Sequence, residues 1–201
     1  MRRSVGFREP AKNILIAAEG PTEVKYFKGL AERNINLRIT AVSDTKTKPY
    51  QIVDYCKVKM KEYGIDLKKG DVAFSVFDVD NNSLEDLIRA VRKAEEYGIR
   101  IVVSNPCFEI WLLLHFREHQ IPLIDKDRIN EELRECGIDF HKNTDYRDVL
   151  TPLRSTAMFN SKKIAEELGL ETPYHFFDTV YSTNVHKVIE LIDEMKRRDV
   201  P

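Results

Sequence analysis

The central segment of this sequence is Val72–Phe77 (VAFSVF), which runs directly into Asp78-Val79-Asp80. A short, continuous apolar run is typical of a strand that is buried on both faces of a parallel sheet. Ligands of such sheets gather at the carboxyl ends of the strands. Because side chains alternate along a strand, Asp78 and Asp80 are expected to face one point while Val79 packs inward. The segment therefore predicts a parallel sheet and also the edge of it at which chemistry is expected.

Apolar runs with the same character lie on both sides of this segment, and helical patterns alternate with them. We expect strands over Asn13–Ala18, Leu37–Val42, Val72–Phe77 and Ile99–Ser104. Helices are expected over Glu23–Leu30, over Pro49–Tyr63 and from a cap at Ser83 to a stop at Gly98. Parallel neighbouring strands need crossover connections. The alternation thus predicts an α/β fold with a mostly parallel, four-stranded sheet that is flanked by helices.

From Cys107 onward the hydrophobic pattern becomes helical. We expect helices over Cys107–Phe116, Lys126–Glu135, Tyr146–Leu153, Ser161–Leu168 and Ser182–Arg197. We interpret residues 10–106 as an α/β core and residues 107–201 as a C-terminal helical extension packed on it. A chain of 201 residues is long enough for one hydrophobic core, so the two parts are expected to form one structural domain.

The composition is that of a globular protein, with 42% hydrophobic and 32% charged residues, which excludes a disordered chain. No apolar run approaches the roughly 20 residues that cross a bilayer, and no signal-peptide core follows Arg2 and Arg3, so we expect a cytoplasmic protein. Cys56, Cys107 and Cys136 are odd in number and lack the spacing of paired ligands. They are expected to be packing residues rather than disulfides or a zinc site.

The charge balance argues against a protein that coats nucleic acid by bulk charge, because 32 Lys and Arg residues face 33 Asp and Glu residues. Any affinity for phosphate must therefore be local. Two basic stretches could contact a phosphate backbone or could simply be solvated faces. They comprise Arg2, Arg3, Arg8 and Lys12, and then Lys57, Lys59, Lys61, Lys68 and Lys69.

Acidic residues follow three of the four predicted strands: Glu19 the first, Asp78 and Asp80 the third, and Glu109 the fourth. Each alone could be an ordinary turn residue. Like charges held together are costly unless something neutralises them, and a hard divalent cation with oxygen ligands does so most often. We therefore predict a Mg²⁺ or Mn²⁺ site. Glu23, one helical turn after Glu19, could be a ligand, a supporting group or a favourable charge at a helix N-terminus.

The same residues resemble a known family. Glu19–Phe27 (EGPTEVKYF) followed by Asp78–Asp80 (DVD) resembles the Toprim domain of topoisomerases, primases and OLD-type nucleases. More narrowly, Ser104–Phe116 (SNPCFEIWLLLHF) and Ser182–Lys187 (STNVHK) resemble the RloB family, which is Toprim-related and occurs beside restriction and phage-defence genes. The resemblance covers roughly residues 10 to 195.

This resemblance implies a Toprim-like fold, metal-dependent nuclease activity on DNA or RNA and an ATPase partner suggested by the family's gene neighbourhoods. By position it makes Glu19 the acidic group of the first strand and Asp78 and Asp80 the Mg²⁺ ligands. Glu109 takes the place of a second acidic position that helps to hold another ion in OLD-type relatives. Relatives often carry Pro-Ser-Thr near the last helix, where this chain has Tyr181-Ser182-Thr183, which weakens any role for Ser182.

The residues allow in-line displacement at a phosphodiester, with the ion stabilising the charge that develops. Glu19 is the candidate general base or leaving-group acid, and Glu109 with Glu23 could hold a second ion, which together with Asp78 and Asp80 completes the candidate catalytic set. Candidate substrate-binding residues are Ser104, Asn105, Lys162, Lys163, His186 and Lys187. For the last four, a plain surface role is the simpler interpretation.

Two other functions remain open from the sequence. The chain could be a non-catalytic Toprim-like component that binds nucleic acid or a nucleotide in a defence complex, or a phosphatase for small phosphoesters. No P-loop, Gly-x-Ser-x-Gly or His-Glu-x-x-His pattern is present in the sequence, so P-loop ATP hydrolysis, serine hydrolysis and zinc proteolysis have no support. Because the net charge is only −1, we hypothesise that a partner or a homodimer supplies part of the nucleic-acid surface.

Overall fold

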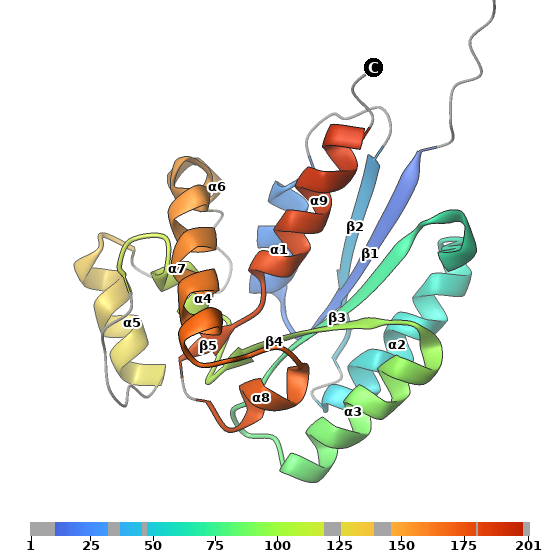
Figure 1. Ribbon diagram of the computed structural model, residues 1–201, viewed down its shortest axis with the longest axis horizontal. Coiled ribbons are helices and arrows are strands. Elements are labelled where there is room, and N and C mark those ends of the chain that lie inside the picture. The colour runs from blue at the N-terminus through green and yellow to red at the C-terminus, as the bar shows by residue number, and fades with distance from the viewer. Residues whose placement is uncertain are drawn as a thin grey trace, which may run out of the picture.

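The computed structural model describes residues 11–31, 37–45, 48–118, 126–138, 146–179 and 181–198, and within them a five-stranded sheet lies between two layers of helices (Figure 1). The strand order is β2-β1-β3-β4-β5. Strands β1 to β4 pair in parallel and β5 pairs antiparallel to β4. The strands are β1 (Lys12–Ala18), β2 (Leu37–Ser43), β3 (Val72–Asp78), β4 (Arg100–Asn105) and β5 (Ser182–Thr183).

The register brings the carboxyl ends of the central strands together. Ala18, the last residue of β1, lies beside Val76, and Asp78, the last residue of β3, lies beside Ser104 of β4. The residues that follow these strands therefore leave the sheet at one edge.

Helices connect the parallel strands and then continue through the carboxyl half of the chain. Pro residues open α1 and α2, where a missing backbone N–H has no cost, and the Ser83 hydroxyl caps α3 by accepting from the N–H of Asp86 at 3.2 Å. The helices are α1 (Pro21–Gly29), α2 (Pro49–Glu62), α3 (Leu84–Tyr97), α4 (Glu109–Leu113), α5 (Lys126–Glu135), α6 (Arg147–Leu150), α7 (Arg154–Glu167), α8 (Pro173–Phe177) and α9 (His186–Arg198), with short 3-10 helices η1 (Leu67–Lys69) and η2 (Thr151–Leu153).

Alternate side chains of β1 build two separate cores. Ile14 and Ile16 belong to the core beneath α1, α4, α5, α7 and α9, whereas Leu15 and Ala17 belong to the core beneath α2, α3 and α8. Figure 1 shows α2 and α3 together on one face of the sheet, with α1 and α9 on the other. A strand that is covered on both faces must be apolar at every position, which is the pattern the sequence shows.

The predicted fold class and the four parallel strands are confirmed, but parts of the carboxyl half were predicted wrongly. Ser182–Thr183 forms a fifth strand, and the last helix begins at His186 instead of Ser182. Helix α7 begins at Arg154, seven residues before the predicted start at Ser161, and α8 was not predicted. Helix α4 covers only Glu109–Leu113 of the predicted Cys107–Phe116.

The fifth strand has a tertiary cause. The Asn184 side chain accepts a hydrogen bond from the N–H of Val103 at 2.7 Å and donates to the carbonyl of Ile101 at 3.3 Å. These bonds hold the segment against β4 and delay the start of α9. Arg2, Arg3 and Arg8 lie outside the described residues. Among the helices of the described ranges, none combines the length and apolarity that crossing a membrane requires.

Candidate acidic site at the carboxyl edge of the sheet

Backbone hydrogen bonds fix where the acidic residues leave the sheet. The N–H of Glu19 donates to the carbonyl of Val76 at 3.1 Å, so pairing between β1 and β3 continues one residue past β1. The N–H of Asp80 donates to the carbonyl of Pro106 at 3.0 Å, which ties the end of β3 to the loop before α4. The peptide bond between Asn105 and Pro106 is cis. Backbone hydrogen bonds of the sheet therefore fix the positions of the chain segments that carry these acidic residues.

Glu19 and Asp78 are in direct contact, because the Glu19 Oε2 accepts a hydrogen bond from the backbone N–H of Asp78 at 3.2 Å. Burial raises the pKa of Glu19, the Asp78 N–H offsets part of that rise, and the nearby charges of Asp80 and Glu109 add to it. Glu19 is thus a carboxylate whose proton affinity is increased by its surroundings.

Glu23 projects from the first turn of α1 into the same region and is only 6% exposed. Its Oε2 is buried without a hydrogen-bond partner among the described residues. Burial, and then the charges of Glu109 and Glu19, raise the pKa of Glu23 to about 7. Gly20 makes room for this carboxylate, because a Cβ at Gly20 would lie 3.1 Å from the Glu23 Oε2.

Asp78 lies at the centre of the group. It is 8% exposed, and burial followed by the charges of Glu23, Glu19, Glu109 and Asp80 raises its pKa well above the ordinary value. Charge effects on a pKa weaken with distance, so the five carboxyl groups lie in one neighbourhood. The structure therefore brings together all five acidic residues that the sequence singled out, and we call this set the acidic cluster.

Lys126, the first residue of α5, is a member of this neighbourhood that the sequence analysis missed. Its Nζ lies 3.9 Å from the Asp80 Oδ2. Burial alone would lower the pKa of Lys126, but the charges of Glu109, Cys107, Asp80 and Asp78 outweigh burial and raise it. No local sequence signal marks this lysine, because its approach depends on how α5 packs against α4.

The acidic cluster has the donors that a hard cation prefers, and two observations fit such an ion. Carboxylate oxygens are the usual ligands of Mg²⁺, and the orphaned Glu23 Oε2 together with the mutual repulsion at Asp78 would both be relieved by positive charge. However, no three His, Cys, Asp or Glu side chains in the described part of the chain stand in the arrangement of a formed metal site. The metal site at Glu19, Asp78, Asp80 and Glu109 therefore stays a prediction.

Cys107 lies beside the cluster but has a structural environment. It is fully buried in the core beneath α1 and α4, and burial together with the charges of Glu109 and Asp78 raises the pKa of its thiol strongly. A thiol that stays protonated is a packing group rather than a thiolate ligand.

Ser104 and Asn105, which the sequence placed beside the site, make internal hydrogen bonds. The Ser104 hydroxyl bonds to the Thr183 hydroxyl at 2.9 Å. The Asn105 amide donates to the carbonyls of Phe176 and Phe177 at 2.9 and 3.2 Å. In this structure both side chains hold β5 and α8 against β4. Their predicted role in substrate binding stays a prediction.

The four remaining candidates for phosphate contact interact with the protein itself. Lys162 pairs with Glu190, Lys163 pairs with Glu118, and Lys187 donates to the carbonyl of Glu171 at 3.2 Å.

His186 is 4% exposed, and its Nδ1 bonds to the Ser161 hydroxyl at 2.7 Å. Burial lowers the pKa of His186 to about 4, so it is neutral at pH 7. Because the Ser161 hydroxyl donates to the carbonyl of Thr183 at 2.7 Å, His186 must donate to Ser161 through its Nδ1–H. These contacts give His186 a structural position at the start of α9.

Comparison with known proteins adds one finding. A sequence model of a protein family described as RloB-like protein matches residues 14–192. A comparison with curated proteins finds no match to this chain.

Proposed function

The chain belongs to the RloB-like family, which associates it with restriction and defence, and on this premise we propose that it is a divalent-metal-dependent nuclease. It would hydrolyse phosphodiester bonds in DNA or RNA as part of a restriction or phage-defence system. The observation that carries the proposal is the convergence of five carboxyl groups at the carboxyl edge of the sheet, with Asp78 buried among the other four. Proteins hold carboxylates in such an arrangement at a cost in stability, and perturbed pKa values of this kind concentrate at functional sites.

Asp78 and Asp80 would hold the first ion, with Glu19 and Glu109 beside it. When bound, Mg²⁺ or Mn²⁺ supplies positive charge that stabilises a phosphodiester oxygen during in-line displacement. Because the carboxyl groups are not gathered as a formed site, some of these side chains would rotate on binding the ion.

The protein's own contribution to the reaction is proton transfer and orientation. Glu19 is the proposed general base, which accepts the proton of the attacking water as its oxygen bonds to phosphorus and the bond to the leaving oxygen breaks. A carboxylate with a raised pKa suits this task, because a base works best when its pKa is close to the operating pH. Glu23, with a pKa of about 7, is placed to exchange protons with the same site.

Partners are part of the proposal. The chain has a net charge of −1, so the acidic cluster needs basic surface elsewhere to retain a polyanion. We propose that a second copy of the chain or an ATPase partner protein supplies part of it. Sizing chromatography with cross-linking would test the homodimer.

The decisive experiment incubates the purified protein with plasmid, single-stranded DNA or transfer RNA in Mg²⁺ or Mn²⁺. Nicking or degradation by the wild type, and its loss in Asp78→Asn, is the expected result. Glu95→Gln is the matched control, because it removes one exposed carboxylate from α3, on the far face of the sheet from α1. If no nucleic acid is cut while divalent ions still bind, the chain is a binding component. Cleavage of a chromogenic phosphoester alone would indicate a phosphatase.

A further inference from the structure

A pocket with both apolar and polar lining residues lies on the outer side of α1, where this helix faces the segment from α6 to α7. Its volume is about 40 Å³. Helix α1 contributes Thr22, Lys25 and Tyr26 to the lining, and the facing segment contributes Arg147, Thr151 and Arg154. All six of these side chains carry a group that can donate a hydrogen bond, and three of them are cations.

Arg154 is the clearest sign that the pocket takes an anion. It is partly buried, and it makes no hydrogen bond or ion pair with any of the residues that the structure describes. Burial raises the pKa of the Tyr26 hydroxyl, and the charge of Arg154 partly offsets that rise, so the guanidinium lies near this hydroxyl. A partly desolvated guanidinium without a carboxylate is costly, and an anionic ligand would compensate it.

Tyr26 supplies a second, independent observation. Its hydroxyl is buried and has no hydrogen-bond partner within the described ranges. The Trp111 indole lies near it, with ring centroids 6.0 Å apart, but the two groups do not reach hydrogen-bond geometry. Since the raised pKa keeps this hydroxyl protonated, it is a donor that an acceptor in the pocket could satisfy.

Arg147 reaches the pocket because the facing residue on α1 is a glycine. A Cβ at Gly29 would lie 3.2 Å from the Arg147 Nε and 3.6 Å from its Cγ. The side chain therefore lies flat against the helix, and any larger residue at position 29 would displace it. Arg147 and Arg154 thus line one pocket from the first residues of α6 and α7.

The pocket adjoins the acidic cluster, but its charge is of the opposite sign. Thr22 lines the pocket, and the next residue, Glu23, belongs to the acidic cluster. The leading influences on the pKa of Glu19 include Lys126, and those on Glu19, Glu23 and Asp78 include none of the cations of this pocket. The arginines are therefore not the groups that act most strongly on these carboxylates.

We propose that this pocket binds a phosphate group. Guanidinium groups and hydroxyl donors are the side chains that recognise phosphate oxygens. The volume is a few times the roughly 10–15 Å³ that one water molecule needs by the same measure, so the pocket has room for a tetrahedral anion such as phosphate. The phosphate could be the terminal group of a nucleic-acid strand or a group of its backbone, and both are the same chemistry. The inference does not rest on the nuclease proposal.

The test uses the full chain in EDTA, so that cleavage plays no part. The chain has one tryptophan, Trp111, which packs on Tyr26, and its fluorescence therefore reports on the pocket. Inorganic phosphate is titrated against chloride at constant ionic strength. Further titrations use a single strand with a 5′-phosphate and the same strand with a 5′-hydroxyl. Asp78→Asn should bind phosphate like the wild type, which separates this proposal from the proposed nuclease activity.

Arg154→Gln should weaken phosphate binding about ten-fold or more, and Tyr26→Phe about three-fold. Arg92→Gln, which removes one exposed arginine from α3, should change binding less than about two-fold. Gly29→Ala tests the pocket without touching a charge, because it displaces Arg147 and should also weaken binding.

Thermal unfolding of each variant shows whether it is folded. Preference for the 5′-phosphate identifies a terminal phosphate, and equal binding of both strands with the same dependence on Arg154 identifies the backbone. The proposal is overturned if neither phosphate nor either strand gives a saturable response. It is also overturned if Arg154→Gln and Arg92→Gln weaken binding equally.

Discussion

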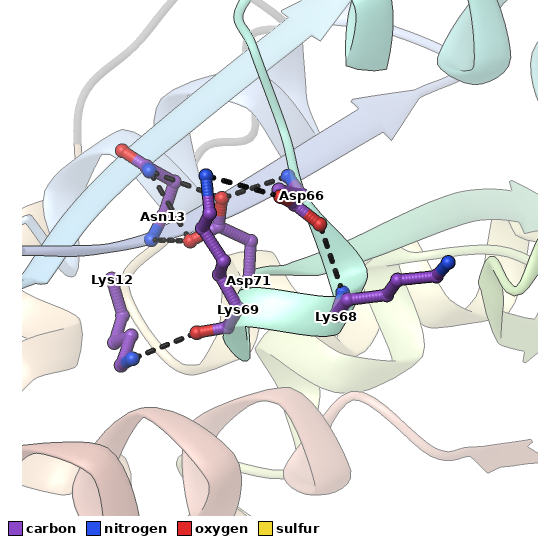
Figure 2. A network of polar contacts seen from close by, with 6 residues as sticks. All are labelled: Lys12, Asn13, Asp66, Lys68, Lys69 and Asp71. Atoms are coloured by element: carbon purple, nitrogen blue, oxygen red, sulfur yellow. Dashed lines mark hydrogen bonds and ion pairs between the residues drawn. The ribbon is translucent and has the colours of Figure 1, made fainter.

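Asp71 and Asp78 lie at the two ends of β3, and each is 8% exposed, but their surroundings are opposite. Asp71, just before the strand, accepts hydrogen bonds from the backbone N–H groups of Asn13 and Asp66 at 2.8 and 2.9 Å (Figure 2). Asp78, at the other end, is surrounded by four more acidic residues. Equal burial therefore stabilises the fold at one end of the strand and opposes it at the other.

The amino end is a finished structural network. Asp71 also accepts from the Asn13 amide at 3.2 Å, and the Asp66 side chain caps η1 by accepting from the N–H of Lys68 at 3.0 Å. Lys12 donates to the carbonyl of Lys69 at 2.7 Å, and Lys69 pairs with Asp66 at 3.3 Å (Figure 2). Here each carboxylate has donors close by, so the charge is compensated within the protein.

The carboxyl end lacks such compensation among the described residues. Lys126 stands 3.9 Å from Asp80, and the Glu23 Oε2 has no hydrogen-bond partner there. A fold that can place donors around one buried aspartate could do so for the other. This difference supports the proposal that the acidic cluster binds positive charge.

The largest expected effect is on nucleic-acid cleavage, which should depend on the carboxyl end of β3 and not on its amino end. Asp78→Asn should lower the rate of nucleic-acid cleavage by about a thousand-fold, because it removes the carboxylate at the centre of the acidic cluster. It should leave the free energy of unfolding unchanged or raise it, since one of the repelling charges is lost. Cleavage assays and chemical denaturation of the same preparation measure both quantities. A variant that loses stability and activity together would contradict the comparison.

The corresponding substitution at the amino end of β3 is expected to change the free energy of unfolding. Asp71→Ala should lower the free energy of unfolding by about 3 kcal/mol, because it leaves the N–H groups of Asn13 and Asp66 without their acceptor. Asp71→Asn keeps one acceptor oxygen and presents an N–H to the other donor, so it should fall between Asp71→Ala and the wild type. Denaturant titrations give the order of the three proteins. Cleavage per folded molecule should not change, and a loss of cleavage in folded Asp71→Asn would argue against a purely structural role.

The buried strands and the acidic residues at their carboxyl ends could be predicted from the sequence, for a physical reason. Buried parallel strands are covered on both faces, so runs such as Val72–Phe77 are continuously apolar, and residues directly after them must lie at the carboxyl edge. The sequence therefore predicted correctly that Glu19, Asp78 and Asp80 lie at this edge. Ligand sites of parallel sheets lie at the carboxyl ends of the strands whatever the details of side-chain packing.

The features that the sequence did not predict depend on contacts between residues that are far apart in the chain. Strand β5 consists of two polar residues with no apolar run, and its place is set by Asn184 bonding to Val103, which lies 81 residues earlier in the chain. Lys126 reaches Asp80 only because α5 packs against α4. Ser104 bonds to Thr183 from β5, so its role could not be inferred while β5 was unknown.

The pH dependence of stability sharpens the comparison further. The pKa of Glu23 is raised from 4.5 to about 7 in the folded protein, so between these values the folded state holds a proton that the unfolded state has released. Stability must then fall as pH rises through this window, by about 3 kcal/mol from this group. Glu23→Gln cannot titrate, and it should remove that part of the slope. Urea denaturation from pH 4.5 to pH 8 measures it.

Glu95→Gln, an exposed change on α3, is the control and should keep the wild-type slope. A slope that Glu23→Gln leaves unaltered would show that its carboxyl group is not the one that responds.

Stabilisation by a bound cation is the smallest expected effect. One experiment compares it in variants at the amino end and at the carboxyl end of β3. An ion that binds only the folded state stabilises it by about 1.4 kcal/mol at ten times its dissociation constant. Mg²⁺ or Mn²⁺ should therefore raise the unfolding temperature of the wild type by a few degrees above that in sodium chloride of equal ionic strength. Folded Asp71→Asn should keep this rise, because its change lies at the amino end of β3. Asp78→Asn should lose the rise, and an equal rise in both variants would mean that the ion binds outside the acidic cluster.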